Sequence, residues 1–185
     1  MAYSNEVIEN LIKSQFYPYN KGQAMKIARV LNGFKYTGNY NFLENKQLRD
    51  LVIVYRCNVE ELKIIKIIPE YIDLFALLGD LKCLKYAYET IKQWGINTCS
   101  NAAKNGHLHC LIYAHENKCP WNERTCINAA RYGNEHCLKY AIENSCSYNE
   151  DVMYFAVLCK QEHCVEYLIK VNCPIDDETI SMMSQ

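Results

Sequence analysis

The sequence predicts an all-α fold, an α-solenoid of stacked helix-turn-helix repeats with a period of 27 residues. Three observations lead to this fold class. Side chains of one type recur at that spacing, each repeat contains two short stretches with helical apolar spacing, and glycine or proline separates those stretches.

Recurring small and sulfur-containing side chains define the repeat. Shifting the sequence by 27 residues aligns three columns that contain cysteine. They are Cys83, Cys110, Cys137 and Cys164; Cys119, Cys146 and Cys173; and Cys99, Cys126, Met153 and Ile180. Alanine pairs at 102–103 and 129–130 align with Ala156-Val157. A fixed period of this kind is the signature of a solenoid, in which each unit packs only on its neighbours.

The unit at 98–117 shows how each repeat is built. Cys99 and the alanines at 102–103 form one helical face, and Gly106 is expected to end that helix in the left-handed conformation. A second apolar face follows, and Pro120 lies just beyond its end. The paired alanines allow the first helices of neighbouring units to approach closely. Asn122, Asn149 and Asp176 stand where each next helix should be capped.

The period divides the chain into an N-terminal helical cap at 1–45 and a repeat domain at 46–185. Its units are expected at 46–69, 70–97, 98–122, 123–149 and 150–175, with a capping helix at 176–185. In the first unit we expect an apolar helix to Tyr55 and a second helix over Val59–Ile68 that Pro69 ends. Ile180 and Met183 fall on core columns of the last helix, for which a self-association face is the alternative to a cap.

Composition limits the function classes. The chain has 185 residues, 50% of them hydrophobic, and a formal net charge of -1. The absence of a basic excess argues against nucleic acid as a partner, and no apolar run approaches the length of a membrane span. The start lacks the basic and apolar regions of a signal peptide. We therefore expect an intracellular protein whose 11 cysteines are reduced thiols without disulfides, the alternative being a secreted disulfide scaffold.

Histidine and cysteine form repeated adjacent pairs at 109–110, 136–137 and 163–164. Adjacent helical residues point about 100° apart, and neighbouring repeats stack about 10 Å apart, so these pairs do not suit one metal ion. No catalytic residue, cofactor or metal is expected. The alternative is a thiol- or metal-dependent enzyme, in which Cys159 is the cysteine without a core column.

The stretch Ala102-Ala103-Lys104-Asn105-Gly106-His107-Leu108 resembles the core of an ankyrin repeat. Residues 105–121 resemble in particular the shortened ankyrin repeats that large DNA viruses of amoebae and algae carry in many copies. The resemblance covers about residues 70–183. The period is about six residues shorter than the usual ankyrin unit, which removes most of the hairpin between units, and Lys160 replaces the turn glycine. Trp94 and Trp121 are expected to fill the gap that the missing hairpin leaves.

The resemblance implies a non-catalytic protein-protein interaction module, with the first helices lining a concave binding face. The residues it places there are Asn101, Lys104, Asn128, Arg131, Tyr132, Phe155 and Leu158. The partner implied is a host or viral protein, in the host cytoplasm or in the virion. The alternative is a structural, self-associating component of a virus particle or replication compartment. A second alternative, for Phe155 and Leu158 alone, is that they pack on the C-terminal helix.

Overall fold

The computed structural model describes Val54 and residues 58–184. These residues form helices and no strand, which confirms the predicted all-α repeat fold. The ten described helices are α4 (Val59–Leu62), α5 (Pro69–Leu78), α6 (Leu81–Ile91), α7 (Thr98–Lys104), α8 (Leu108–Glu116), α9 (Glu123–Arg131), α10 (Glu135–Glu143), α11 (Glu150–Leu158), α12 (Glu162–Lys170) and α13 (Asp177–Met183). The predicted cap at 1–45 and the helix to Tyr55 fall outside this description, apart from Val54.

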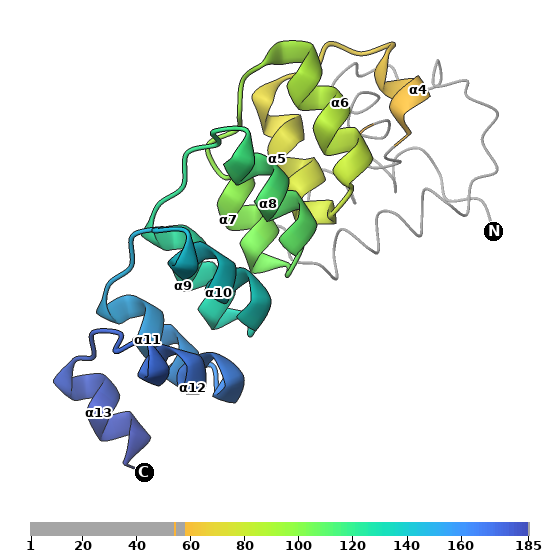
Figure 1. The fold of residues 1–185 in the computed structure, drawn as a ribbon. Helices are drawn as coiled ribbons and strands as arrows, with labels where there is room; N and C mark the ends of the chain where they lie inside the picture. The colour runs from red at the N-terminus through yellow and green to blue at the C-terminus, as the bar shows by residue number, and fades with distance from the viewer. Residues whose placement is uncertain (1–53, 55–57, 185) are drawn as a thin grey trace, which may run out of the picture.

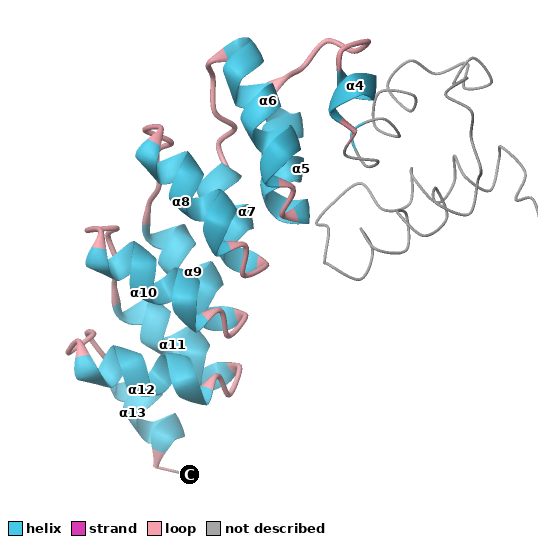
Figure 2. Ribbon diagram, turned by 45° about the vertical axis from the view of Figure 1, so that its right-hand side comes forward, coloured by secondary structure: helices cyan, strands magenta, loops and turns pink. Residues whose placement is uncertain are grey.

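The helices from α5 onward form hairpins that stack into one elongated array (Figure 1). Within a hairpin α5 packs on α6, α7 on α8, α9 on α10 and α11 on α12. The first helices α5, α7, α9 and α11 also pack on one another in order, and so do the second helices, so that two layers result (Figure 2). The 27-residue period and the unit boundaries stay sequence-based predictions, and the pairing of the helices agrees with the expected hairpins.

The turn inside each hairpin needs a left-handed residue. Gly79, Gly106 and Gly133 have φ angles of 77°, 72° and 71° there, a region that is nearly free of cost for glycine only. The turn is also tied to the next repeat, because the side-chain amide of Asn134 donates to the carbonyls of Ala103 (2.9 Å) and Lys104 (2.8 Å). These bonds satisfy carbonyls at the end of α7 that have no partner within the helix.

Lys160 occupies the same turn between α11 and α12 with a φ of 55°. For a residue other than glycine, this conformation costs about 1–2 kcal/mol. Glycine at this position removes that cost, but its greater freedom in the unfolded chain offsets part of the gain. We therefore expect Lys160→Gly to raise the free energy of unfolding by about 1 kcal/mol in urea titrations. Lys160→Ala is the control, since it removes the charge and keeps the strain. Equal stability of the two variants would contradict the argument.

The core consists of small side chains between the first helices and larger ones beneath the second helices. Ala102, Ala129 and Ala156 are fully buried in α7, α9 and α11, which permits the close approach of these helices. Leu84, Leu111, Leu138 and Leu168 are fully buried in the second helices. Nine of the ten described cysteines are buried too, and all ten are free thiols. Cysteine here serves as a small apolar side chain.

Trp94 and Trp121 lie between successive hairpins, half-buried against the core. Trp94 stacks on Tyr88 with ring centroids 3.9 Å apart, and its indole Nε1 donates to the carbonyl of Asn117 at 3.0 Å. Trp121 stacks on His115 at the same separation. Each tryptophan therefore joins the end of one second helix to the hairpin that follows.

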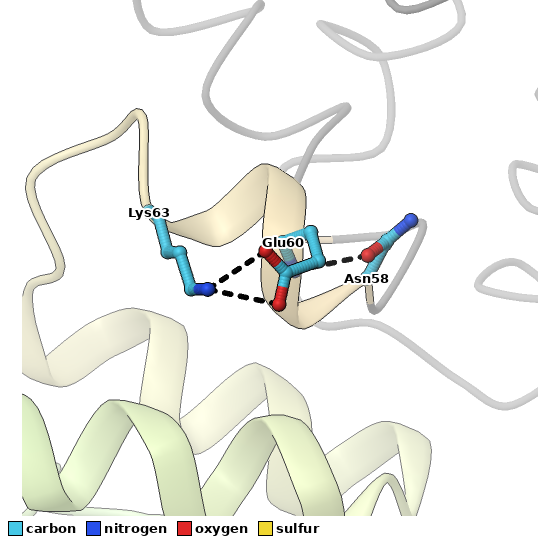
Figure 3. A network of polar contacts seen from close by, with 3 residues as sticks. All are labelled: Asn58, Glu60 and Lys63. Carbon is cyan, nitrogen blue, oxygen red and sulfur yellow. Dashed lines mark hydrogen bonds and ion pairs between the residues drawn. The ribbon is translucent and has the colours of Figure 1, made fainter.

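The region before α5 differs from the prediction. The helix expected over Val59–Ile68 ends at Leu62, and Pro69 is the first residue of α5 where we expected it to end a helix. Proline suits a first helical turn because its missing N–H has no partner there, and it holds the preceding Ile68 in extended backbone. Asn58 caps α4, and the Lys63 ammonium pairs with the Glu60 carboxylate at 2.7 Å (Figure 3).

The last helix also corrects the prediction. Ile180 and Met183 were expected in the core, and they are 47% and 44% exposed. Helix α13 packs on α11, and within the described residues no second helix follows to cover these side chains. Thr179, one position earlier, is the residue of α13 that is fully buried.

Candidate protein-binding surface

The seven residues predicted to bind a partner all lie on α7, α9 and α11 or at the end of α9. These helices are neighbours in the array, so the residues share one surface, which we call the first-helix surface. The structure divides them into two groups. Two asparagines belong to the contacts between repeats, and the other five residues lie toward the C-terminal ends of the helices, where the charged and aromatic ones meet.

Asn101 and Asn128 connect successive first helices. The side-chain amide of Asn101 donates to the carbonyl of Asp73 at 3.2 Å, and that of Asn128 donates to the carbonyl of Ser100 at 3.4 Å. Both residues are half-buried. Their amides thus hold neighbouring helices together, and this stacking role was not part of the sequence prediction.

Basic and aromatic side chains alternate across the three helices. The Lys104 ammonium lies 5.2 Å from the centre of the Tyr132 ring, and the Arg131 guanidinium lies 5.9 Å from the same ring. Arg131 also lies 5.1 Å from the centre of the Phe155 ring. Each distance is within the range of cation–π attraction. The residues predicted separately from three repeats therefore form one continuous cluster, the basic-aromatic cluster Lys104, Arg131, Tyr132 and Phe155.

Two of the four residues of this cluster face solvent, and so does Leu158 on α11. Tyr132 is 46% exposed and Leu158, one helical turn beyond Phe155, is 50% exposed. Arg131 is exposed, whereas Lys104 and Phe155 are half-buried. The exposure of Leu158 does not support the alternative that it packs under the C-terminal helix. Tyrosine and arginine are the residue types enriched at interface hot spots, and here both Tyr132 and Arg131 contact neighbouring side chains of the cluster.

Tyr154 is a neighbour of the cluster that the sequence analysis missed. Its ring meets that of Phe155 edge to face with centroids 5.3 Å apart, and it is half-buried. The corresponding positions in earlier repeats hold Ser100 and Ile127. The aromatic replacement in this column was a signal that could have extended the predicted site.

The repeated His–Cys pairs point apart, as the sequence predicts. His109, His136 and His163 are exposed and the cysteine that follows each is buried. Burial raises the pKa of Cys110 to about 12 and that of Cys137 to about 11, so both remain thiols at neutral pH. Among Val54 and residues 58–184, no three His, Cys, Asp or Glu side chains are grouped as metal ligands. Cys159 is half-buried.

Asp73 is a buried carboxylate in α5 that fixes the start of the next repeat. It accepts hydrogen bonds from the Thr98 hydroxyl (2.6 Å) and the Asn97 backbone N–H (3.2 Å). A Cβ at Gly95 would clash with the same carboxylate, so the loop before α7 closes tightly over it. Burial raises the pKa of Asp73, and the hydrogen bonds from Thr98 and Asn97 oppose that rise only in part.

A pH prediction follows from this raised pKa. The folded chain binds the Asp73 proton more tightly than the unfolded chain, so the stability that Asp73 contributes is lost as pH rises through its folded pKa. Asp73→Asn keeps one acceptor oxygen and removes the charge. We expect the free energy of unfolding of Asp73→Asn, relative to that of the wild type, to increase from pH 4 to pH 7. Paired urea titrations measure this difference, because the contributions of all other carboxylates are common to both proteins and cancel. A difference that stays flat or falls with pH would contradict this assignment.

Comparison with known proteins gives one match. Residues 99–179 match the family model for ankyrin repeats, in three copies. The matched segment begins in α7 and ends in α13. It includes all seven residues of the first-helix surface, whereas α5, which Asn101 contacts, lies before it. No curated protein and no solved structure matches the chain. Within the described residues, every helix is too short or too polar to cross a lipid bilayer.

Proposed function

We propose that the three ankyrin repeats of residues 99–179 bind another protein through the first-helix surface, on the concave side of the array, without catalysis. Ankyrin repeats generally mediate protein–protein interaction and are typically non-catalytic. The observation that supports this surface is the basic-aromatic cluster, in which Lys104, Tyr132, Arg131 and Phe155 converge from three helices. Such a row of positioned side chains resembles the anchor residues of protein interfaces.

The partner proposed is a host or viral protein, and this setting rests on the resemblance of residues 105–121 to viral ankyrin repeats. The cluster itself supports only a protein partner of some kind. Its cations are spread along a surface with interspersed aromatic rings, and the whole chain carries a formal net charge of -1. This balance does not favour binding to a phosphate backbone.

The double variant Tyr132→Ala with Phe155→Ala tests the surface. Tyr132 is exposed and Phe155 half-buried, so we expect little loss of melting temperature and at least about a tenfold loss of partner capture, as for interface anchors. Quantitative affinity capture from cells that make the chain compares each co-purifying protein between the variant and the wild type.

A matched control removes two aromatic rings from the second helices, Tyr113 in α8 and Tyr167 in α12. Because both rings pack against the core, the control is expected to lower the melting temperature more and to retain the partner. Unchanged capture by the Tyr132–Phe155 variant would refute the proposed surface. Capture of further copies of this chain alone would favour the structural, self-associating alternative.

A further inference from the structure

The charged side chains of the first-helix surface are separated along its helices. Each of the three repeats has one cation in the last turn of the first helix or in the turn that follows, namely Lys104, Arg131 and Lys160. The corresponding segments contain no aspartate or glutamate; they are 101–107, 128–134 and 155–161. Figure 2 shows the turns after α7, α9 and α11 along one edge of the array. We call the three cations at these turns the basic edge.

Carboxylates lie at the opposite ends of the same helices. Glu123 is the first residue of α9, and Glu150 and Asp151 are the first two residues of α11. Each of these helices has nine residues, so its two ends are about 12 Å apart by the rise of an α-helix. Salt at physiological concentration screens exposed charges over about 8 Å. The carboxylates at the helix starts therefore do not neutralise the basic edge.

A second group of carboxylates follows the turns, at the starts of the second helices. Asp80 caps α6 and accepts the backbone N–H of its third residue at 2.8 Å. Glu135 of α10 pairs with the Lys139 ammonium at 2.6 Å. Glu162 is exposed at the start of α12, two residues beyond Lys160. We therefore restrict the charge argument to the cations of α7 and α9.

Those two cations converge on one exposed ring. The Lys104 ammonium and the Arg131 guanidinium lie 5.2 and 5.9 Å from the centre of the Tyr132 ring, which is 46% exposed. Cations in a last helical turn suit the helix dipole, so their position alone does not indicate a ligand. The dipole does not account for the exposed ring that they share, nor for Leu158, 50% exposed at the end of the next first helix. Like charges beside one ring repel each other, and an anion from outside relieves that repulsion.

We propose that the basic edge binds an acidic segment of the partner protein, an inference that rests on the proposed function of the first-helix surface. Carboxylates of the segment pair with Lys104 and Arg131, and an apolar side chain packs against Tyr132 and Leu158. Packed helices lie about 10 Å apart, which is about three residues of extended chain. The segment therefore carries acidic residues and, about three positions away, a leucine or an aromatic residue.

Single-stranded nucleic acid is the competing polyanion, because it also binds to cations interspersed with aromatic rings. Two converging cations neutralise few phosphates, and affinity for nucleic acid depends on the number neutralised. Leu158 extends the surface with an aliphatic side chain, on which a base cannot stack. These two features favour the acidic peptide.

Peptides selected by the 185-residue chain from a phage-displayed library of random dodecapeptides test the proposal. We expect enrichment of aspartate and glutamate, with an apolar residue about three positions from a carboxylate. The most enriched peptide is then labelled with fluorescein and titrated in fluorescence anisotropy. Replacing its carboxylates by amides should weaken binding at least about tenfold, and so should Lys104→Glu combined with Arg131→Glu. Both losses should shrink in high salt.

Lys82→Glu combined with Lys170→Glu is the matched control. It changes the net charge by the same amount at exposed sites on the second helices α6 and α12. We expect binding to stay within about twofold of the wild type, because these charges lie away from the basic edge. Circular dichroism checks the fold of both variants, and the amide peptides keep the test valid if the charge reversal unfolds the chain.

The outcomes separate this inference from the proposed function. Neutral or basic peptides that the Tyr132–Phe155 variant no longer binds would overturn the acidic segment and leave the protein-binding surface in place. Selected peptides that bind equally to every variant would overturn both. Failure to enrich any peptide would overturn the acidic segment. So would displacement of the labelled peptide by oligouridylate of equal length at equal affinity, since the surface would then recognise a polyanion of another class.

Discussion

Leu111→Ala is expected to lower the free energy of unfolding by about 2–5 kcal/mol, the range for truncating a large side chain in a rigid core. Leu111 is fully buried in α8, which packs on α7 within its hairpin and on α6 and α10 in the neighbouring hairpins. A cavity there is expected to weaken the packing of α8 on its neighbours. Urea unfolding followed by circular dichroism at 222 nm measures the effect.

Leu158→Ala is the control for this prediction, because the same side chain is removed from a half-exposed site. Its effect should remain within about 0.5 kcal/mol. If the two variants unfolded at similar urea concentrations, Leu111 would not lie in a shared core. A broadened transition for Leu111→Ala would fit a repeat array in which hairpins unfold separately.

Ala129→Leu tests the opposite change, an increase in volume. Ala129 is fully buried in α9, and α9 packs on both α7 and α11. Three additional carbon atoms must displace a neighbouring helix, so we expect a loss of about 1–3 kcal/mol, or more where the backbone cannot shift. Thermal unfolding measures the loss.

Arg124→Leu, on the exposed face of the same helix, provides the comparison for Ala129→Leu. It adds leucine to α9 without entering the interface and should change stability by about 0.5 kcal/mol or less. Tolerance of leucine at position 129 would mean that the first helices do not approach as closely as the described packing requires.

The fold could be predicted because residue type and burial agree in each repeat. A cysteine or alanine that recurs at a fixed spacing needs a small apolar site each time, and the structure buries Cys110, Cys137, Ala102 and Ala129 accordingly. Gly106 predicted a left-handed turn for a backbone reason, and Gly133 has the same conformation one repeat later. These signals are local or periodic, so one sequence contains them.

The errors arose where a residue's role depends on a neighbour in space. Pro69 ends helices and also begins them, and only the position of α5 decides between the two. Asn149 stands at the start of α11 as predicted, but its side chain donates to Asp151 at 3.0 Å and does not cap the helix backbone. Ile180 matches a core column, and its exposure depends on an element that would have to pack beyond it.

The candidate surface was predictable as a set of positions, and its organisation was not. Spacing placed Lys104, Arg131 and Phe155 on one side of three helices. The cation–π contacts among them depend on side-chain directions that the repeat pattern does not specify. The same limit applies to Asn101 and Asn128, whose amides bind the backbone of the preceding repeat. Their assignment to partner binding stays a prediction.

Contacts among alanine methyl groups test the stacked hairpins most directly. In a sample with 13C-labelled alanine methyls, a nuclear Overhauser experiment should connect the Ala102–Ala103 pair of α7 with the Ala129–Ala130 pair of α9, and that pair with Ala156 of α11. Signals that connect alanines only within their own hairpins, or that connect α7 with α11 directly, would contradict the ordered array on which the proposed binding surface depends.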